Sequence, residues 1–160
     1  MPLHTIPPVF DAESEVLILG SFPSVKSRET NFFYGHPQNR FWRVLAAVYG
    51  ETAVPCTTEE KITFLKVHRI ALWDVLRSCE IEGSSDVSIR NAVPNDLSQI
   101  FETATIDRIF VNGATAKRYY DRCLKPIWNR EAVCLPSTSP ANASFSLERL
   151  IAAWQVIRKN

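Results

Sequence analysis

The stretch E-V-L-I-L-G-S-F-P-S-V-K-S-R-E-T-N-F-F-Y-G-H-P-Q-N-R-F-W, residues 15–42, decides the fold that we expect for this chain. Its apolar run 16–19 is short, contains β-branched residues and ends at Gly20. Such a run is typical of a strand that is buried on both faces of a parallel sheet. A polar loop follows, and apolar residues at helical spacing then predict a helix over 39–50. Because open parallel sheets bind ligands where their strands lead into helices, we expect a ligand site in the loop 20–39.

The rest of the chain repeats this alternation of strand and helix. Further buried strands are expected over 69–74, 106–111 and 132–135, and helices over 57–68, 95–104, 114–125 and from 146 onward. Thr57 and Glu60 form a capping-box pattern, and Ser146 is placed to cap the last helix. Residues 79–94 are expected to be an irregular polar loop. The alternation predicts an α/β fold with a mostly parallel sheet, in which the loops 20–39, 112–113 and 136–142 meet in one cleft.

Composition bounds the class of protein. The 160 residues are 46% apolar and 22% charged, which is typical of one globular domain, and we expect a single domain over 1–160. The net charge of +1 means that any contact with nucleic acid depends on local basic clusters. There is no leader-like or membrane-spanning run, so we expect a cytoplasmic monomer. The cysteines show no paired spacing and predict reduced thiols without a metal centre: Cys56, Cys79, Cys123 and Cys134.

Four motifs resemble those of the uracil-DNA glycosylase superfamily. G-S-F-P-S at 20–24 with Y-G-H-P-Q-N-R-F-W at 34–42 resembles motif 1 and its loop, and L-P-S-T-S-P-A-N at 135–142 resembles motif 2. A-L-W-D-V at 71–75 and F-V-N-G at 110–113 match in kind and order. The pattern is most similar to the hypoxanthine-DNA glycosylase branch. The resemblance implies a three-layer α-β-α sandwich around a four-stranded, mostly parallel sheet.

Asn39 is the expected catalytic residue. Many members of the superfamily carry Asp or Asn two residues after the first glycine of motif 1, where this chain has Phe22. The resemblance instead implies the asparagine of H-P-Q-N, which is Asn39. A carboxamide is a poor general base, so we expect it to accept a hydrogen bond from the attacking water and orient it. The alternative is a helix N-cap, and the two roles are compatible.

The resemblance also implies a pocket for the base. Asn112 offers a donor and an acceptor for a base edge, Tyr34 corresponds to the aromatic residue that stacks on the flipped base, and Phe22 forms a wall. The alternative for Asn112 is an Asn-Gly turn. Phe32 and Phe33 are expected in the core.

The motif 2 loop and nearby cations are the expected DNA contacts. Hydroxyls and amides of 137–139 suit phosphate, and Pro140 or Ala141 is a candidate wedge for the vacated stack, against the alternative of a plain Ser/Thr turn. Motif 2 usually begins with His or Asn, where this chain has Leu135, so no leaving-group contact is expected there. The full set of expected DNA contacts is Ser137, Thr138, Ser139, Pro140, Lys26 and Arg40.

These expectations combine into one hypothesis about function. We expect a monofunctional DNA glycosylase that excises a deaminated base, with hypoxanthine (deoxyinosine) the leading candidate, and needs neither metal nor cofactor. Removal of uracil is the enzyme alternative, and an inactive nucleic-acid-binding domain of the same fold is the other. An abasic-site endonuclease is the expected downstream partner.

Overall fold

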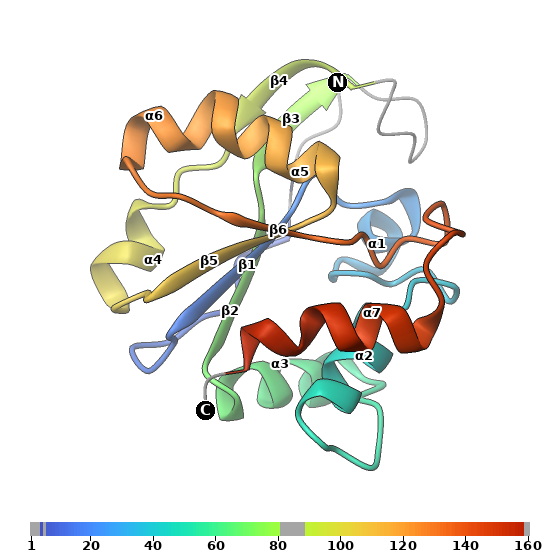
Figure 1. Ribbon diagram of the computed structural model, residues 1–160. Helices are drawn as coiled ribbons and strands as arrows, with labels where there is room; N and C mark the ends of the chain where they lie inside the picture. The colour runs from blue at the N-terminus through green and yellow to red at the C-terminus, as the bar shows by residue number, and fades with distance from the viewer. Residues whose placement is uncertain (1–3, 5, 81–88, 159–160) are drawn as a thin grey trace.

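Four parallel strands form the centre of the molecule. The computed structural model describes residues 4, 6–80 and 89–158. The strands lie in the order β2 (Ile70–Asp74), β1 (Val16–Gly20), β5 (Arg108–Asn112) and β6 (Val133–Leu135) (Figure 1). Each of the three pairings is parallel, which confirms the strands and the direction that the sequence predicts.

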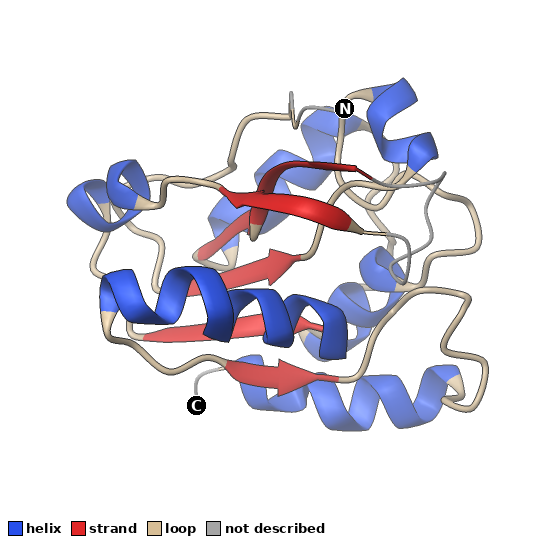
Figure 2. Ribbon diagram, turned by 90° about the horizontal axis from the view of Figure 1, so that it is seen from above, coloured by secondary structure: helices blue, strands red, loops and turns tan. Residues whose placement is uncertain are grey.

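Helices cover both faces of this sheet and give the three predicted layers (Figures 1 and 2). One face carries α2 (Phe41–Val48), α3 (Thr58–Val67) and α7 (Leu147–Trp154), and the other carries α4 (Ser98–Thr103), α5 (Ala114–Tyr119) and α6 (Lys125–Trp128). Alternate side chains of a strand point to opposite faces. Val16 and Ile18 of β1 therefore pack with the first group, and Leu17 and Leu19 pack with the second.

The expected helix starts have the predicted caps. The Thr57 side chain accepts a hydrogen bond from the Glu60 amide at 3.1 Å, and the Glu60 carboxylate accepts one from the Thr57 amide at 2.9 Å. The Ser146 hydroxyl accepts from the Arg149 amide at 3.2 Å. The helix expected over 114–125 instead runs to residue 128, through a π-helical turn at Tyr120–Leu124.

A hairpin and a short helix were not predicted. The chain expected to be irregular over 79–94 forms part of an antiparallel hairpin, β3 (Leu76–Glu80) with β4 (Arg90–Pro94). The prediction failed because β4 is mostly exposed and carries no apolar alternation. The second element is a short helix, α1 (Val25–Thr30), in the loop after β1, where Ser24 accepts a hydrogen bond from the Ser27 amide. Residues 81–88, which belong to the same expectation, lie outside the described residues.

The amino-terminal segment runs along the outer edge of the sheet. Val9 and Leu72 exchange two backbone hydrogen bonds of 3.0 and 2.9 Å in an antiparallel bridge. The His4 amide donates to the Arg77 carbonyl at 2.6 Å. This segment therefore brings His4 to the end of β2. Within the described residues, the structure contains no helix with the length and apolar character to cross a membrane.

Candidate active site

A cavity of about 340 Å³ lies at the carboxyl ends of the parallel strands. Gly20, Asp74 and Asn112, the last residues of β1, β2 and β5, line it together with residues of the loops 20–39 and 136–142. The three loops singled out from the sequence therefore meet in one place, as expected for an open α/β sheet. Every expected base-site residue lines this cavity: Phe22, Tyr34, Asn39 and Asn112.

Asn39, Thr138 and Asn112 are joined by a chain of hydrogen bonds. Asn112 Nδ2 donates to Thr138 Oγ1 at 3.0 Å, and Thr138 Oγ1 donates to Asn39 Oδ1 at 2.8 Å. The Thr138 amide donates to Asn112 Oδ1 at 3.1 Å. Thr138 is fully buried, with 0% exposure. Its hydroxyl is therefore an internal link, which corrects the expectation that the Thr138 side chain contacts DNA.

The oxygen of Asn39 is already occupied. Asn39 Oδ1 also accepts the amide N–H of Phe41 at 3.0 Å. The cap alternative is wrong, because α2 begins at Phe41 with Arg40 as its N-cap residue, and Asn39 precedes that position. An amide oxygen has two lone pairs, and both now have protein donors. The expected contact, in which Oδ1 accepts a hydrogen bond from water, is not available in this arrangement. The polar atom that Asn39 can offer to a ligand is Nδ2, for which the described residues provide no acceptor.

Asn112 retains half of its hydrogen-bonding capacity. Both of its side-chain polar atoms are joined to Thr138, but the amide keeps a second N–H and a second lone pair. The pairing fixes the plane of the amide at the end of β5. A base edge that approaches it meets a donor and an acceptor in a set orientation.

The aromatic residues of the cavity are held by the core. Tyr34 has a left-handed backbone (φ 53°) and stacks on Phe41 with ring centroids 4.0 Å apart and planes at 21°. Phe22 is buried, and the Arg28 guanidinium lies 5.6 Å from its ring centre. Phe32 and Phe33 are buried, as predicted. The stacking surface is therefore rigid before any ligand enters.

Gly20 sits where these groups approach most closely. A β-carbon added there would overlap Asp74 Oδ1 and lie 2.7 Å from the Tyr34 hydroxyl oxygen. The glycine of motif 1 is therefore required by lack of space beneath the cavity, since a methyl group displaces either the carboxylate or the ring.

Arg40 holds the motif 2 loop in place by hydrogen bonds to the loop backbone. The guanidinium donates to the carbonyls of Ser139 at 3.0 Å and Asn142 at 3.1 Å, and to that of Phe145. The Arg40 amide also donates to the Thr138 carbonyl at 3.1 Å. These bonds direct three guanidinium donors at the protein's own loop, which argues against the expected phosphate contact from Arg40.

The tip of that loop is exposed. Ser137 and Ser139 accept hydrogen bonds from the amides of Ser139 and Ala141, each at 3.1 Å, so the Ser/Thr-turn alternative holds for their oxygens. Pro140 and Ala141 are exposed beside the cavity. The side chain of Lys26, the remaining expected DNA contact, lies outside the described part of the structure.

One carboxylate of the cavity wall, and the residue that it pairs with, were missed from the sequence. Asp74 lines the cavity at the end of β2, and its Oδ2 lies 2.8 Å from Nε2 of His4. Their side chains are 4% and 0% exposed. The position of Asp74 directly after a buried strand was the available signal. The partnership with His4, 70 residues earlier, had none.

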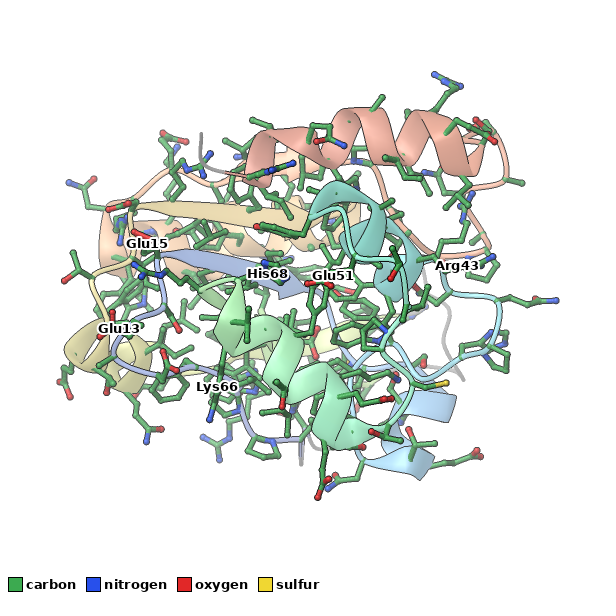
Figure 3. All side chains as sticks on the ribbon, turned by 90° about the horizontal axis from the view of Figure 1, so that it is seen from below. Glu13, Glu15, Arg43, Glu51, Lys66 and His68 are labelled. Carbon is green, nitrogen blue, oxygen red and sulfur yellow. The ribbon has the colours of Figure 1, made fainter. Side chains whose placement is uncertain are left out.

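A smaller cavity of about 180 Å³ lies at the opposite ends of the strands, beside the start of β1. His68 and Glu51, which are adjacent in Figure 3, form a hydrogen bond there with 2.9 Å between Nε2 and Oε1. Burial raises the pKa of the neighbouring Tyr49 to about 12, although Arg108 and Arg158 act to lower it. This cavity lacks the paired carboxamides of the larger one, so the candidate active site is the larger cavity.

Comparisons with known proteins agree on one family. The model of the uracil DNA glycosylase superfamily matches residues 7–158. A protein named hypoxanthine DNA glycosylase from Methanosarcina acetivorans is 36% identical over 151 residues, 94% of each chain. One of the same name from Methanosarcina barkeri is 32% identical over 154 residues, 96% of each chain. A solution NMR structure from M. acetivorans superimposes with a TM-score of 0.78 at 36% identity, covering 95% of this chain and 96% of the other.

Proposed function

The chain belongs to the uracil DNA glycosylase superfamily, and from this premise we propose that it is a monofunctional DNA glycosylase that releases hypoxanthine from DNA. Two relatives that match over nearly their full length are named hypoxanthine DNA glycosylase. The observation that carries the proposal is that an aromatic ring and two carboxamides, both bonded to Thr138, line the same cavity. This combination suits a flat, polar-edged base.

Base binding follows from the cavity walls. The target nucleotide leaves the stack, and its base enters between Tyr34 and the loop 136–142. Stacking on an aromatic ring contributes about 1–3 kcal/mol. Asn112 presents its remaining N–H and lone pair to the base edge. The exposed tip at Pro140 and Ala141 fills the vacated stack, with Ser137 and Ser139 near the phosphates.

The chemistry is hydrolysis of the bond between N9 and C1′. The bonding pair leaves with the base, the sugar acquires oxocarbenium character, and the oxygen of a water molecule bonds to C1′. Asn39 holds this water through Nδ2, which donates to the water oxygen. One water proton is released, and the departing base takes up a proton. An oxocarbenium-like centre needs an oriented water more than a strongly activated one, so a carboxamide is sufficient.

We propose that this hydrolysis proceeds without strand cleavage and without a Schiff base between the protein and the sugar. The product is an abasic site, which an endonuclease must then process. We further propose that residues 1–160 act as one domain and as a monomer.

The test is a panel of oligonucleotides that carry one hypoxanthine, uracil or undamaged base, incubated with the wild type and with Asn39→Ala. Abasic sites are detected by alkaline cleavage. We expect release of hypoxanthine by the wild type and a loss of about 100-fold or more in Asn39→Ala. Asp121→Asn, which changes a charge that pairs with Lys117 outside the cavity, serves as the control and should match the wild type.

Two results contradict the proposal. Faster release of uracil than of hypoxanthine assigns the enzyme to the other base. DNA binding without any abasic site, across the whole panel, assigns the chain to nucleic-acid binding alone.

A further inference from the structure

The unassigned feature of the cavity is the carboxylate of Asp74. Asp74 is 3% exposed, ends β2 beside Gly20, and takes no part in the water or stacking roles above. Removing a carboxylate from water is costly unless it is paired and hydrogen-bonded. A buried carboxylate in the wall of a ligand cavity therefore calls for a partner on each oxygen.

His4 accounts for one of these oxygens. Its Nε2 lies 2.8 Å from Asp74 Oδ2, and its ring packs edge-on against Phe22 and Trp73 with centroids 6.1 and 5.9 Å away. His4 Nδ1 is buried and has no hydrogen-bond partner among the described residues, which favours the tautomer with the proton on Nε2. His4 therefore donates to Oδ2 and fixes the rotation of the carboxylate.

The other oxygen, Oδ1, lies in the space above Gly20. It occupies the position that a β-carbon at Gly20 would need, at the wall of the cavity. The backbone is fixed as well, because Asn95 Nδ2 donates to the Asp74 carbonyl at 2.9 Å. Adjacent strands are about 4.8 Å apart. Asp74 on β2 and Asn112 on β5 therefore stand on opposite sides of Gly20, about 10 Å apart at the backbone, and both line the cavity.

An ionised carboxylate only accepts hydrogen bonds. Deamination changes the base in the matching way. Adenine has a lone pair at N1, whereas hypoxanthine has N1–H, and cytosine has a lone pair at N3, whereas uracil has N3–H. A carboxylate opposite this ring position attracts the deaminated base and repels its parent.

We propose that Asp74, oriented by His4, is the residue that selects a deaminated base, by accepting the ring N–H that its parent lacks. This inference rests on the proposed glycosylase function. Guanine also carries N1–H and differs by its 2-amino group, so it does not probe this contact.

The test compares hypoxanthine with unsubstituted purine (nebularine), which has a lone pair at N1 and no oxygen at C6. Single-turnover release is measured for the wild type, Asp74→Asn and the control Asp121→Asn. Binding of the same bases is measured on uncleavable 2′-fluoro-arabino nucleotides. In Asp74→Asn, His4 still donates to the amide oxygen, so the amide N–H faces the base and fits a lone pair.

We expect the wild type and Asp121→Asn to prefer hypoxanthine by about 100-fold or more, as a site built to bind an N–H does. In Asp74→Asn the preference for hypoxanthine over purine should fall by at least about tenfold. An unchanged preference in folded Asp74→Asn overturns the inference. So does equal binding of the two bases by the wild type, a result that needs no variant.

A different result would refute the proposed function. A wild type that excises another base but not hypoxanthine refutes the activity, while the binding ratio on uncleavable DNA still decides the role of Asp74.

Discussion

Replacing Thr138 by valine tests the hydrogen-bond chain that joins the two carboxamides. Thr138 is fully buried, and its hydroxyl accepts from Asn112 Nδ2 and donates to Asn39 Oδ1. Valine keeps the shape and removes both bonds, each of which contributes about 1 kcal/mol net. It also leaves an N–H of Asn112 without its acceptor. We expect the free energy of unfolding to fall by about 2–3 kcal/mol, which lowers Tm by about 5–10 °C.

The effect on catalysis is expected to be larger than the effect on folding suggests. Without the Thr138 hydroxyl, Asn39 Oδ1 loses one of its two donors, and the amide can rotate away from the water. A displacement of about 1 Å at a reacting group costs up to about 100-fold in rate. We therefore expect single-turnover release of hypoxanthine, at saturating enzyme and a temperature where the variant is folded, to fall by about 10- to 100-fold.

Thr138→Ser is the matched control. It keeps the hydroxyl and loses a methyl group, which lowers stability by about 1 kcal/mol. Its single-turnover rate should stay near that of the wild type. If Thr138→Val and Thr138→Ser release hypoxanthine equally fast, the chain does not orient Asn39 and the reasoning is refuted.

Further predictions follow from single contacts. Asn39→Asp replaces the Nδ2 donor by an acceptor, so release at neutral pH should fall about 100-fold, and retained activity would mean that Asn39 accepts from water after all. Gly20→Ala forces its methyl group against the Asp74 carboxylate, so Tm should fall with a cost of about 1–3 kcal/mol, and hypoxanthine release should fall with it. Arg40→Met removes three hydrogen bonds to the motif 2 loop, so the stability measured by urea unfolding should fall by about 2–3 kcal/mol, and the salt dependence of DNA binding should keep its slope, whereas a phosphate contact would lower it. Burial raises the pKa of Tyr49 to about 12, above its unfolded value of about 10, so stability is lost as pH rises from 10 through 12. Urea unfolding across this range should show that Tyr49→Phe loses about 1–2 kcal/mol less than the wild type.

Local patterns in the sequence were sufficient to predict the parallel sheet and the starts of two helices. Each strand of the parallel sheet is a short apolar run, and the ends of α3 and α7 follow from Thr57, Glu60 and Ser146, whose partners lie within three residues. The hairpin β3–β4 was not predicted because β4 is largely exposed. Its sequence therefore lacks the alternation of apolar and polar residues that indicates a half-buried strand.

The same distinction between local sequence patterns and tertiary contacts applies to the candidate site. The motifs around Tyr34, Asn39 and Asn112 identify which residues to place together, and the carboxyl ends of parallel strands explain why they meet. The sequence alone did not reveal that Arg40 holds the motif 2 loop, or that Thr138 is buried between two asparagines.

What the sequence by itself determined is therefore the order of the parallel strands and of the helices that cover them, the family, and the loops that form the cavity. Only the tertiary structure decided which polar atoms are already occupied and which still face a ligand. It paired His4 with Asp74 across 70 residues, and Thr138 with Asn39 across 99. Helix and strand patterns arise from neighbours a few residues apart, whereas the direction of a hydrogen bond depends on side chains that come together only when the sheet and its loops have packed.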